Sequence, residues 1–186
     1  MGNSAIGRGT AVEDFKVKAS SADATPGFLD AKVGGGLSVA ADLLVATAGT
    51  SAFQVRQATS QDNIAIGVNQ LVWNSEIFDL GNDFASNTFT APVTGKYQFD
   101  CHIRLNSWDS AAGNYQLGFS MSNRAYATVT NGTDLSVDGI NDLGLSVLAD
   151  MDAGDTCVAN ISQSSGTVQT DIIGGTDSSF SGFLVV

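Results

Sequence analysis

The sequence predicts an all-β protein in which two antiparallel sheets pack as a sandwich. One supporting observation is the composition, with 21 glycines against 2 prolines and many serine, threonine, asparagine and valine residues, which favours short strands joined by tight turns. The second is a strict alternation of apolar and polar residues in several segments, which indicates strands with one buried face. With 186 residues, the chain can form one domain of ordinary size and a small appendage.

The clearest strand lies within residues 89–103, and the other elements are interpreted around it. Pro92 cannot donate a ladder hydrogen bond and therefore precedes the strand, and Gly95 permits the turn that begins it. Apolar and polar residues then alternate: Tyr97, Phe99, Cys101 and Ile103 share one face, and Gln98, Asp100 and His102 share the other. This period of two predicts a half-buried strand.

Similar patterns recur further along the chain. Two further strands are predicted, each with apolar residues at every second position. These are Tyr115, Leu117, Phe119 and Met121 in the first, and Leu143, Leu145 and Val147 in the second. The last segment, 180–186, is apolar on both faces apart from Ser181 and Gly182. Such a strand either lies in the middle of a sheet with both faces covered or has its outer face in a subunit interface.

The phrase F-x-A-P-V-x-G-x-Y-x-F, from Phe89 to Phe99, resembles the central signature of the C1q-like (C1q/TNF) jelly-roll domains. Residues 51–56 resemble the first strand of that family, and 71–74 followed by 77–79 resemble its paired short strands, with Trp73 where Phe is usual. Asp79 to Phe84 matches the loop before the central strand. The stretch from Asp152 to Cys157 resembles the A-G-D-x-V turn of the family.

The end of the chain completes the resemblance, because residues 178–186 resemble the C-terminal strand S-x-F-S-G-F-L-L. The residues that carry the signature are Phe53, Trp73, Asn74, Phe89, Pro92, Gly95, Tyr97, Phe99, Gly154, Asp155, Phe180, Gly182 and Phe183. The match spans residues 51–186, so we expect a jelly-roll head domain there. The resemblance also implies a homotrimer packed around a three-fold axis.

Residues 1–50 are expected to form a small β-rich anchor or stalk. Phe15, Val17 and Ala19 alternate with lysines as in a short strand, and 25–27 has the Thr-Pro-Gly sequence of a type II turn. The segment 19–33, and especially 23–33, resembles a short element of bacteriophage tail-fibre and other virion proteins, although a simple strand, turn and strand is an equal alternative. Residues 37–48 fit either a helix or a strand.

Charge and hydropathy exclude several classes of partner. The formal net charge of −11 would repel a phosphate backbone, so we expect no binding of nucleic acid. The longest apolar run, 37–48, is interrupted by Asp42 and is shorter than the roughly 20 residues of a membrane span, so we expect no membrane insertion. Residues 1–4 lack the basic and apolar regions of a signal peptide, and we therefore do not expect secretion.

The sequence offers few candidates for catalysis or for cofactor binding. His102 is the single histidine and faces away from the predicted core, which is typical of a surface residue and not of a general base. Asp150, Asp152 and Asp155 are candidate calcium ligands, although they coincide with the family turn and do not match an EF-hand loop. We expect no other cofactor.

Two further features have a functional and a purely structural interpretation. Cys101 and Cys157 could form a disulfide or a reactive thiol, but two small buried residues are the favoured interpretation. The Asn-, Ser-, Thr- and Asp-rich stretches 106–114, 122–134 and 162–178 are either loops that bind a glycan or receptor or ordinary solvated turns.

These features predict a non-enzymatic structural or attachment protein of a bacteriophage particle. In this hypothesis residues 1–50 contact other virion proteins, and the trimeric head 51–186 lies on the virion surface as a capsid decoration or a tail tip. Its partner would be a glycan or protein of the host surface, and assembly would occur in the host cytoplasm. The alternative is a bacterial C1q-like adhesin module that binds carbohydrate or protein.

Overall fold

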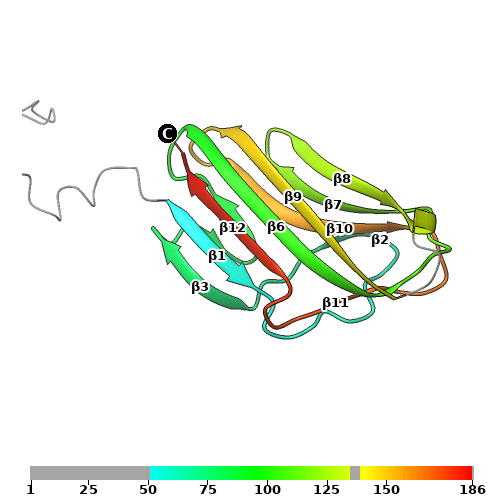
Figure 1. The fold of residues 1–186 in the computed structure, drawn as a ribbon. Helices are drawn as coiled ribbons and strands as arrows, with labels where there is room; N and C mark the ends of the chain where they lie inside the picture. The colour runs from blue at the N-terminus through cyan, green and yellow to red at the C-terminus, as the bar shows by residue number, and fades with distance from the viewer. Residues whose placement is uncertain (1–50, 135–138, 186) are drawn as a thin grey trace, which may run out of the picture. The chain divides into compact units, whose positions relative to one another are not determined.

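The computed structural model describes residues 51–134 and 139–185 (Figure 1). The strand and turn predicted at 15–19 and 25–27, the fibre-like segment 23–33 and the ambiguous run 37–48 lie outside the described residues. The described part is all-β. Its strands are β1 Ala52–Arg56, β2 Gly67–Gln70, β3 Ser75–Leu80, β4 Phe84–Ala85, β5 Thr88–Thr90, β6 Gly95–Trp108, β7 Asn114–Met121, β8 Ala125–Asn131, β9 Gly139–Met151, β10 Thr156–Ser164, β11 Asp171–Ile172 and β12 Ser179–Leu184.

The strands form two antiparallel six-stranded sheets, here called sheet A and sheet B. In sheet A the order is β3, β1, β12, β6 and β9, and β11 pairs with the end of β6 beyond β12. In sheet B the order is β4, β5, β10, β7 and β8, and β2 pairs with β10 beyond β5. Figure 1 shows the two sheets packed face to face, as predicted for an antiparallel jelly-roll sandwich.

The core between the sheets is rich in aromatic rings because one face of nearly every strand is apolar. Phe53 lies at its centre, with ring centroids 4.8 Å from Phe84, 5.1 Å from Phe89 and 5.0 Å from Phe180. In a second group of rings, away from Phe53, the indole of Trp108 stacks on the ring of Tyr115 at a centroid distance of 4.0 Å. Such aromatic pairs add to the hydrophobic stabilisation that burial provides.

The predicted faces of the strands are confirmed. Tyr97, Phe99, Cys101 and Ile103 of β6 are all buried, and so are the four predicted residues of β7. On β9, Leu143 is buried while Leu145 and Val147 are partly buried against the core. Alternation along each of these strands therefore correctly separates the core residues from the outward-facing ones.

The prediction that 71–74 and 77–79 form two paired short strands is wrong. Only 75–80 forms a strand there, and that strand, β3, pairs with β1. Residues 71–74 are not in a strand, because their backbone groups bond to single partners: Leu71 N–H donates to the carbonyl of Ala159, and Trp73 N–H to the side-chain oxygen of Asn87. These bonds tie the segment to β10 and to the turn between β4 and β5.

The description of 106–114, 122–134 and 162–178 as loops also needs correction. Strand β8 occupies 125–131 at the edge of sheet B, and 106–108, 162–164 and 171–172 belong to β6, β10 and β11. The β-branched and aromatic residues of β8 support a strand, and its pairing with β7 leaves it as an edge strand that is exposed at every second residue. Polar composition alone therefore misidentified an edge strand as a loop.

Candidate functional site on the outer face of sheet A

One face of sheet A points into the core, and the other faces away from the sandwich with no covering element among the described residues. The register aligns outward-facing residues in rows across β1, β12, β6 and β9. The rows are Ala52, Phe183, Gln98 and Leu148, then Gln54, Ser181, Asp100 and Ser146, then Arg56, Ser179, His102 and Gly144. We call this surface the outer face.

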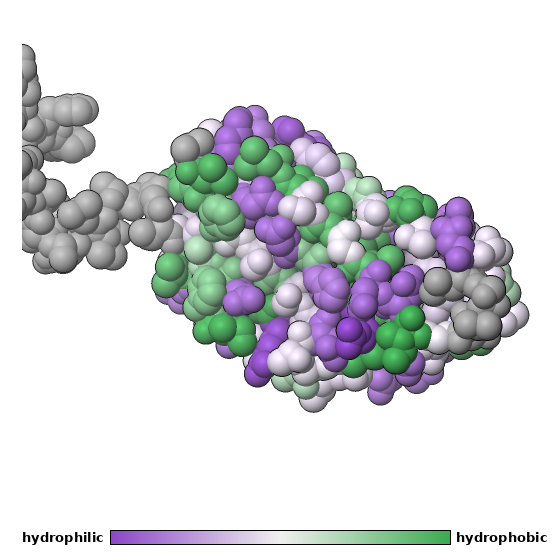
Figure 2. All heavy atoms as spheres, in the orientation of Figure 1, coloured by the Kyte–Doolittle hydropathy of each residue, from purple (hydrophilic) through white to green (hydrophobic). Residues whose placement is uncertain are grey.

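One end of the outer face is apolar. Phe183 is 47% exposed and Leu148 58% exposed, and they are joined there by Phe78, Leu80 and Val185. Figure 2, which views this side of the molecule, shows hydrophobic residues gathered toward the C-terminal end of β12 and hydrophilic residues over the middle of the sheet. The last strand, β12, lies in the middle of sheet A, and the described residues cover only one of its faces. The structure therefore leaves its outer side available for an interface.

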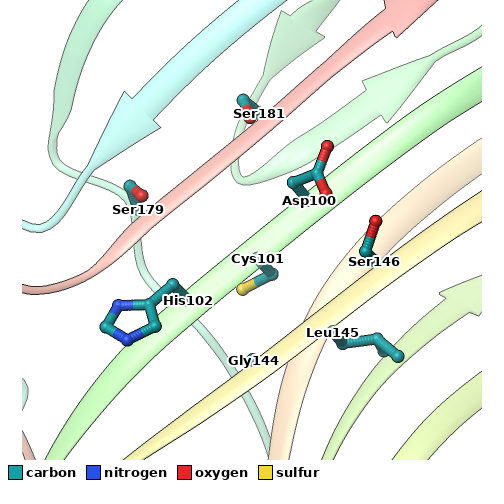
Figure 3. Close-up of a pocket in the computed structure, with 8 residues that line it drawn as sticks. All are labelled: Asp100, Cys101, His102, Gly144, Leu145, Ser146, Ser179 and Ser181. Carbon is teal, nitrogen blue, oxygen red and sulfur yellow. The ribbon is translucent and has the colours of Figure 1, made fainter.

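The middle of the outer face is hollowed, because its side chains are small. A cavity of about 350 Å³ opens there between β12, β6 and β9, bordered by Asp100, His102, Gly144, Ser146, Ser179 and Ser181. Figure 3 shows Asp100 and Ser146 on neighbouring strands, with the imidazole of His102 near Ser179. Three hydroxyls, one carboxylate and the imidazole of His102 border this hollow beside the apolar side chain of Leu145. A side chain from another molecule could enter it.

Ion pairs cross the outer face at both ends of the hollow. The Arg104 guanidinium donates to Asp142 at 3.0 Å and to Asp177 at 2.9 Å, and these hydrogen bonds and charges raise its pKa. Lys96 pairs with Asp150, whose pKa it lowers. Residues 51–186 contain fourteen acidic and four basic residues, and three of the four basic residues, Arg56, Lys96 and Arg104, lie on this face. The outer face is therefore much less negative than the rest of the domain.

His102 is exposed on the outer face, as the alternation predicts. Its Nδ1 lies 3.0 Å from the carbonyl oxygen of Asp177, and its Nε2 lies 3.9 Å from Asp142 Oδ1. Both neighbours are hydrogen-bond acceptors, and within the described residues no hydroxyl or thiol nucleophile is hydrogen-bonded to the ring. This geometry offers no support for general-base catalysis.

The three candidate calcium ligands lie near one another but already have partners. Asp150 pairs with Lys96, while Asp155 accepts hydrogen bonds from Ser122 at 2.5 Å, from Asn123 at 2.7 Å and from the Asp152 backbone at 2.9 Å. The hydrogen bonds from Ser122 and from the Asp152 backbone hold the pKa of Asp155 below its usual value. Among residues 51–134 and 139–185, no three carboxylate, histidine or cysteine side chains gather as metal ligands would. The aspartates serve the turn between β9 and β10.

The two cysteines are unpaired and buried in the core, in agreement with the favoured interpretation. Burial raises the pKa of both thiols, of Cys101 on β6 and of Cys157 on β10, so neither is a nucleophile at neutral pH.

Two of the signature phrases meet at one end of the sandwich. Gly154 has a φ of 91°, and its N–H donates to the carbonyl of Ala91 at 2.8 Å, while the Ala91 N–H donates to the carbonyl of Asp155 at 2.8 Å. Pro92 lies in the same connection, between β5 and β6, and Gly95 begins β6. The hydroxyl of Tyr97 donates to the carbonyl of Val93 at 2.7 Å and ties this connection to the core.

Most of the other signature residues stabilise the fold through burial or hydrogen bonds. Phe53, Trp73, Phe89, Phe99 and Phe180 are buried in the core. Asn74 accepts from the Ala58 N–H at 2.6 Å and donates to Thr59 Oγ1 at 2.6 Å, which secures the chain after β1. Gly182 lies under core rings, and Phe183 is the exception, because it points outward.

Sequence reasoning missed most of the outer face. Arg104, Asp142, Ser146, Leu148 and Asp177 come from strands and loops far apart in the chain, and only the pairing of β9 and β12 with β6 brings them together. The sequence signal for this face was the set of alternate residues in β6 and β12 that do not point into the core: Gln98, Asp100, His102 and Phe183.

Comparison with known proteins identifies the family. A family model, the C1q domain, matches residues 52–185. This chain belongs to the C1q domain family. Among solved structures, this C1q domain is similar to the globular domain of zebrafish complement 1qA protein, with a TM-score of 0.52, 19% identity and coverage of 73% of this chain and 98% of that one.

The C1q domain also resembles murine APRIL, in crystal structures at pH 8.5 and pH 8.0. Their TM-scores are 0.51 and 0.52, at 10% and 8% identity, and each covers 73% of this chain and 99% of the other. At such identities the likeness establishes the jelly-roll fold alone. A search of curated proteins found no matching sequence. No helix among the described residues has the length and hydropathy that crossing a membrane requires.

Proposed function

We propose that this protein is a non-enzymatic C1q-domain module that assembles as a homotrimer through the outer face of sheet A. The observation that carries the proposal is the exposed apolar group at one end of that face, which contains Phe183, Leu148 and Leu80. Covering such a group removes apolar surface from water, at about 25 cal/mol per Å². C1q domains typically form trimers, which supports three as the number of protomers.

The charge distribution supports self-association on the same face. Residues 51–186 carry a formal charge of −10 from fourteen acidic and four basic residues, so two copies repel each other at most orientations. The repulsion is weakest where the net negative charge is smallest, and on the outer face Arg56, Lys96 and Arg104 offset most of the carboxylates. Contact through this face therefore brings the least unfavourable charges together.

The test is the mass of the full-length protein in solution. Multi-angle light scattering should give about three times 19.1 kDa. Leu148→Asp, on the outer face, should reduce the mass to that of a monomer, because it places a carboxylate in the apolar contact. Val68→Asp is the matched control, because Val68 is also exposed but lies on the outer side of sheet B.

A wild-type monomer at micromolar concentration would refute the proposed assembly. So would a Leu148→Asp variant that remains trimeric while Val68→Asp dissociates. Far-UV circular dichroism of both variants verifies that the β fold is retained.

We further propose that the trimer is a structural or attachment protein on the surface of a bacteriophage particle. The support is the resemblance of residues 23–33 to virion fibre proteins, together with a head that three copies would present multivalently to a glycan or protein of the host surface. In this arrangement residues 1–50 bind other virion proteins, and the C1q domain is a capsid decoration or a tail tip. A bacterial adhesin module with the same head is the alternative.

Electron microscopy with an antibody against this protein separates the two roles. Label on capsids or tail tips of purified particles is the expected result. Label confined to the bacterial envelope would refute the virion role and favour the adhesin.

A further inference from the structure

His102 lies on the outer face, and the partner of each of its ring nitrogens among the described residues is an acceptor. Its Nδ1 lies 3.0 Å from the carbonyl oxygen of Asp177, and a carbonyl only accepts, so this nitrogen carries a hydrogen in the neutral ring as well as in the charged one. In the neutral ring, Nε2 then presents its lone pair 3.9 Å from the carboxylate of Asp142. Protonation of Nε2 converts this contact into an ion pair.

The groups around His102 contain more negative than positive charge. Asp100 and Arg104 flank it on β6, Asp142 faces it from β9, and Asp177 from the chain before β12. Arg56, the charged residue of β1 on the same row, donates to Ser75 at 3.4 Å.

The single guanidinium of Arg104 is shared by two of these carboxylates, those of Asp142 and Asp177. The Asp100 carboxylate accepts a hydrogen bond from the Gln98 amide at 3.5 Å and has no ion-pair partner among the described residues. Three carboxylates thus face one fixed cation, and the charge that His102 gains on protonation offsets half of the remaining excess.

This excess matters when the outer face is covered. In a free protomer, water solvates the half-exposed ring and carboxylates. Contact with another protomer removes that water, and an uncompensated carboxylate then becomes costly. A proton on His102 lowers this cost, and histidine is the side chain that changes charge between about pH 5 and about pH 8.

We propose that protonation of His102 promotes assembly of the trimer, so that protomers associate more tightly in mildly acidic than in neutral or alkaline solution. This inference rests on the proposed function, because it assigns regulation to the interface proposed above. Its physical basis is that association takes up protons. If each protomer binds one additional proton, the overall association constant changes by up to about a thousandfold per pH unit, a factor of about ten for each of three protons.

The experiment measures trimer dissociation of the full-length protein at constant ionic strength. Fluorescently labelled protein is diluted at about pH 5.5 and about pH 8, and sedimentation velocity gives the concentration at which the trimer dissociates. Dissociation at a lower protein concentration at the acidic pH is the expected result. Constant salt is essential, because screening also changes the repulsion between acidic domains.

Two variants separate His102 from the acidic groups around it. His102→Gln keeps a donor for the Asp177 carbonyl but does not titrate, so its dissociation concentration should differ much less between the two pH values than that of the wild type. His102→Lys carries a fixed charge and should assemble at about pH 8 nearly as tightly as the wild type does at about pH 5.5. Circular dichroism at both pH values verifies the fold of each variant.

The possible failures are distinguishable. A protein that is monomeric at both pH values refutes the proposed assembly and the regulation with it. A trimer whose dissociation does not depend on pH refutes the regulation alone. A His102→Gln variant with the full wild-type pH dependence also refutes it, because the carboxylates and not His102 would then bind the protons.

Discussion

Gly182 of β12 lies directly beneath the ring of Phe99 on β6, its partner across the strand pair. A Cβ atom at Gly182 would lie 2.6 Å from Cδ1 of Phe99 and 2.8 Å from Cε1 of Phe53, which is closer than carbon atoms approach. The glycine therefore allows two aromatic rings to pack against the backbone of the central strand. This contact joins the C-terminal signature phrase to the central one.

Gly182→Ala should destabilise the domain by about 1–3 kcal/mol, because the two rings must leave their packed positions. Gly144→Ala is the matched control, since a Cβ there meets only the Cys101 carbonyl oxygen, at 3.9 Å. Because Gly144 borders the proposed interface, both substitutions are best compared in urea unfolding of the Leu148→Asp variant. Equal stabilities of the two variants would contradict the packing described here.

Phe99→Ala should cost about 3–5 kcal/mol, because the side chain is fully buried among aromatic rings and its removal leaves a cavity. Gln98→Ala, at the adjacent position on the outer face, should cost about 1 kcal/mol or less in a monomer, through loss of its 2.8 Å hydrogen bond to Ser146. Thermal unfolding in the Leu148→Asp background measures both. Similar losses would mean that the two faces of β6 are wrongly assigned.

Asp109→Asn should destabilise the protein at neutral pH by about 1–3 kcal/mol. The buried carboxylate accepts three backbone hydrogen bonds, from Val168 at 2.9 Å, Thr167 at 2.6 Å and Ala111 at 2.8 Å, and those from Val168 and Thr167 contribute most to lowering its pKa.

The direction of the pH effect follows from that lowered pKa. The stabilisation by Asp109 is present above the carboxyl pKa of the unfolded chain, about 4, and is lost as the pH falls through the lower pKa of the folded state. Urea unfolding should therefore show a difference between the wild type and Asp109→Asn that shrinks in acid. Exposed Asp62→Asn is the control. A difference that is constant from neutral to acidic pH would contradict this role.

A chain shortened to residues 51–186 should fold and form a trimer, because the described core and the outer face lie entirely within it. In the proposed virion role it should not join particles assembled without the native protein, since the anchor is missing. Circular dichroism, light scattering and electrophoresis of purified particles test the three expectations. Decoration at the level of the full-length protein would place the attachment surface on the C1q domain itself.

The faces of individual strands were predictable from the sequence, because alternation is a local property of the extended backbone. Each side chain of β6 from Tyr97 to Ile103 was assigned to the correct face without knowledge of its neighbours. The signature phrases also predicted the jelly roll. For the last strand, apolar on both faces, the sequence left open whether the outer face is covered within the domain or in a subunit interface.

The pairing of strands was decided only by the tertiary structure. Residues 71–74 have a strand-like composition, yet their backbone groups bond to single partners and leave β3 to pair with β1. The stretch 122–134 is rich in polar residues, yet within it β8 pairs with β7 as an edge strand. Composition could not decide either case, because hydrogen bonds between distant segments outweigh local preference.

The candidate site shows the same division. The sequence by itself determined that Asp100 and His102 face outward from a half-buried strand. Only the tertiary structure brought Asp142 and Asp177, from 38 to 75 residues further along the chain, within reach of Arg104 and His102. The physical reason is that the period of a strand specifies which side chains share its face, while the register with β9 and β12 specifies which charges those side chains meet.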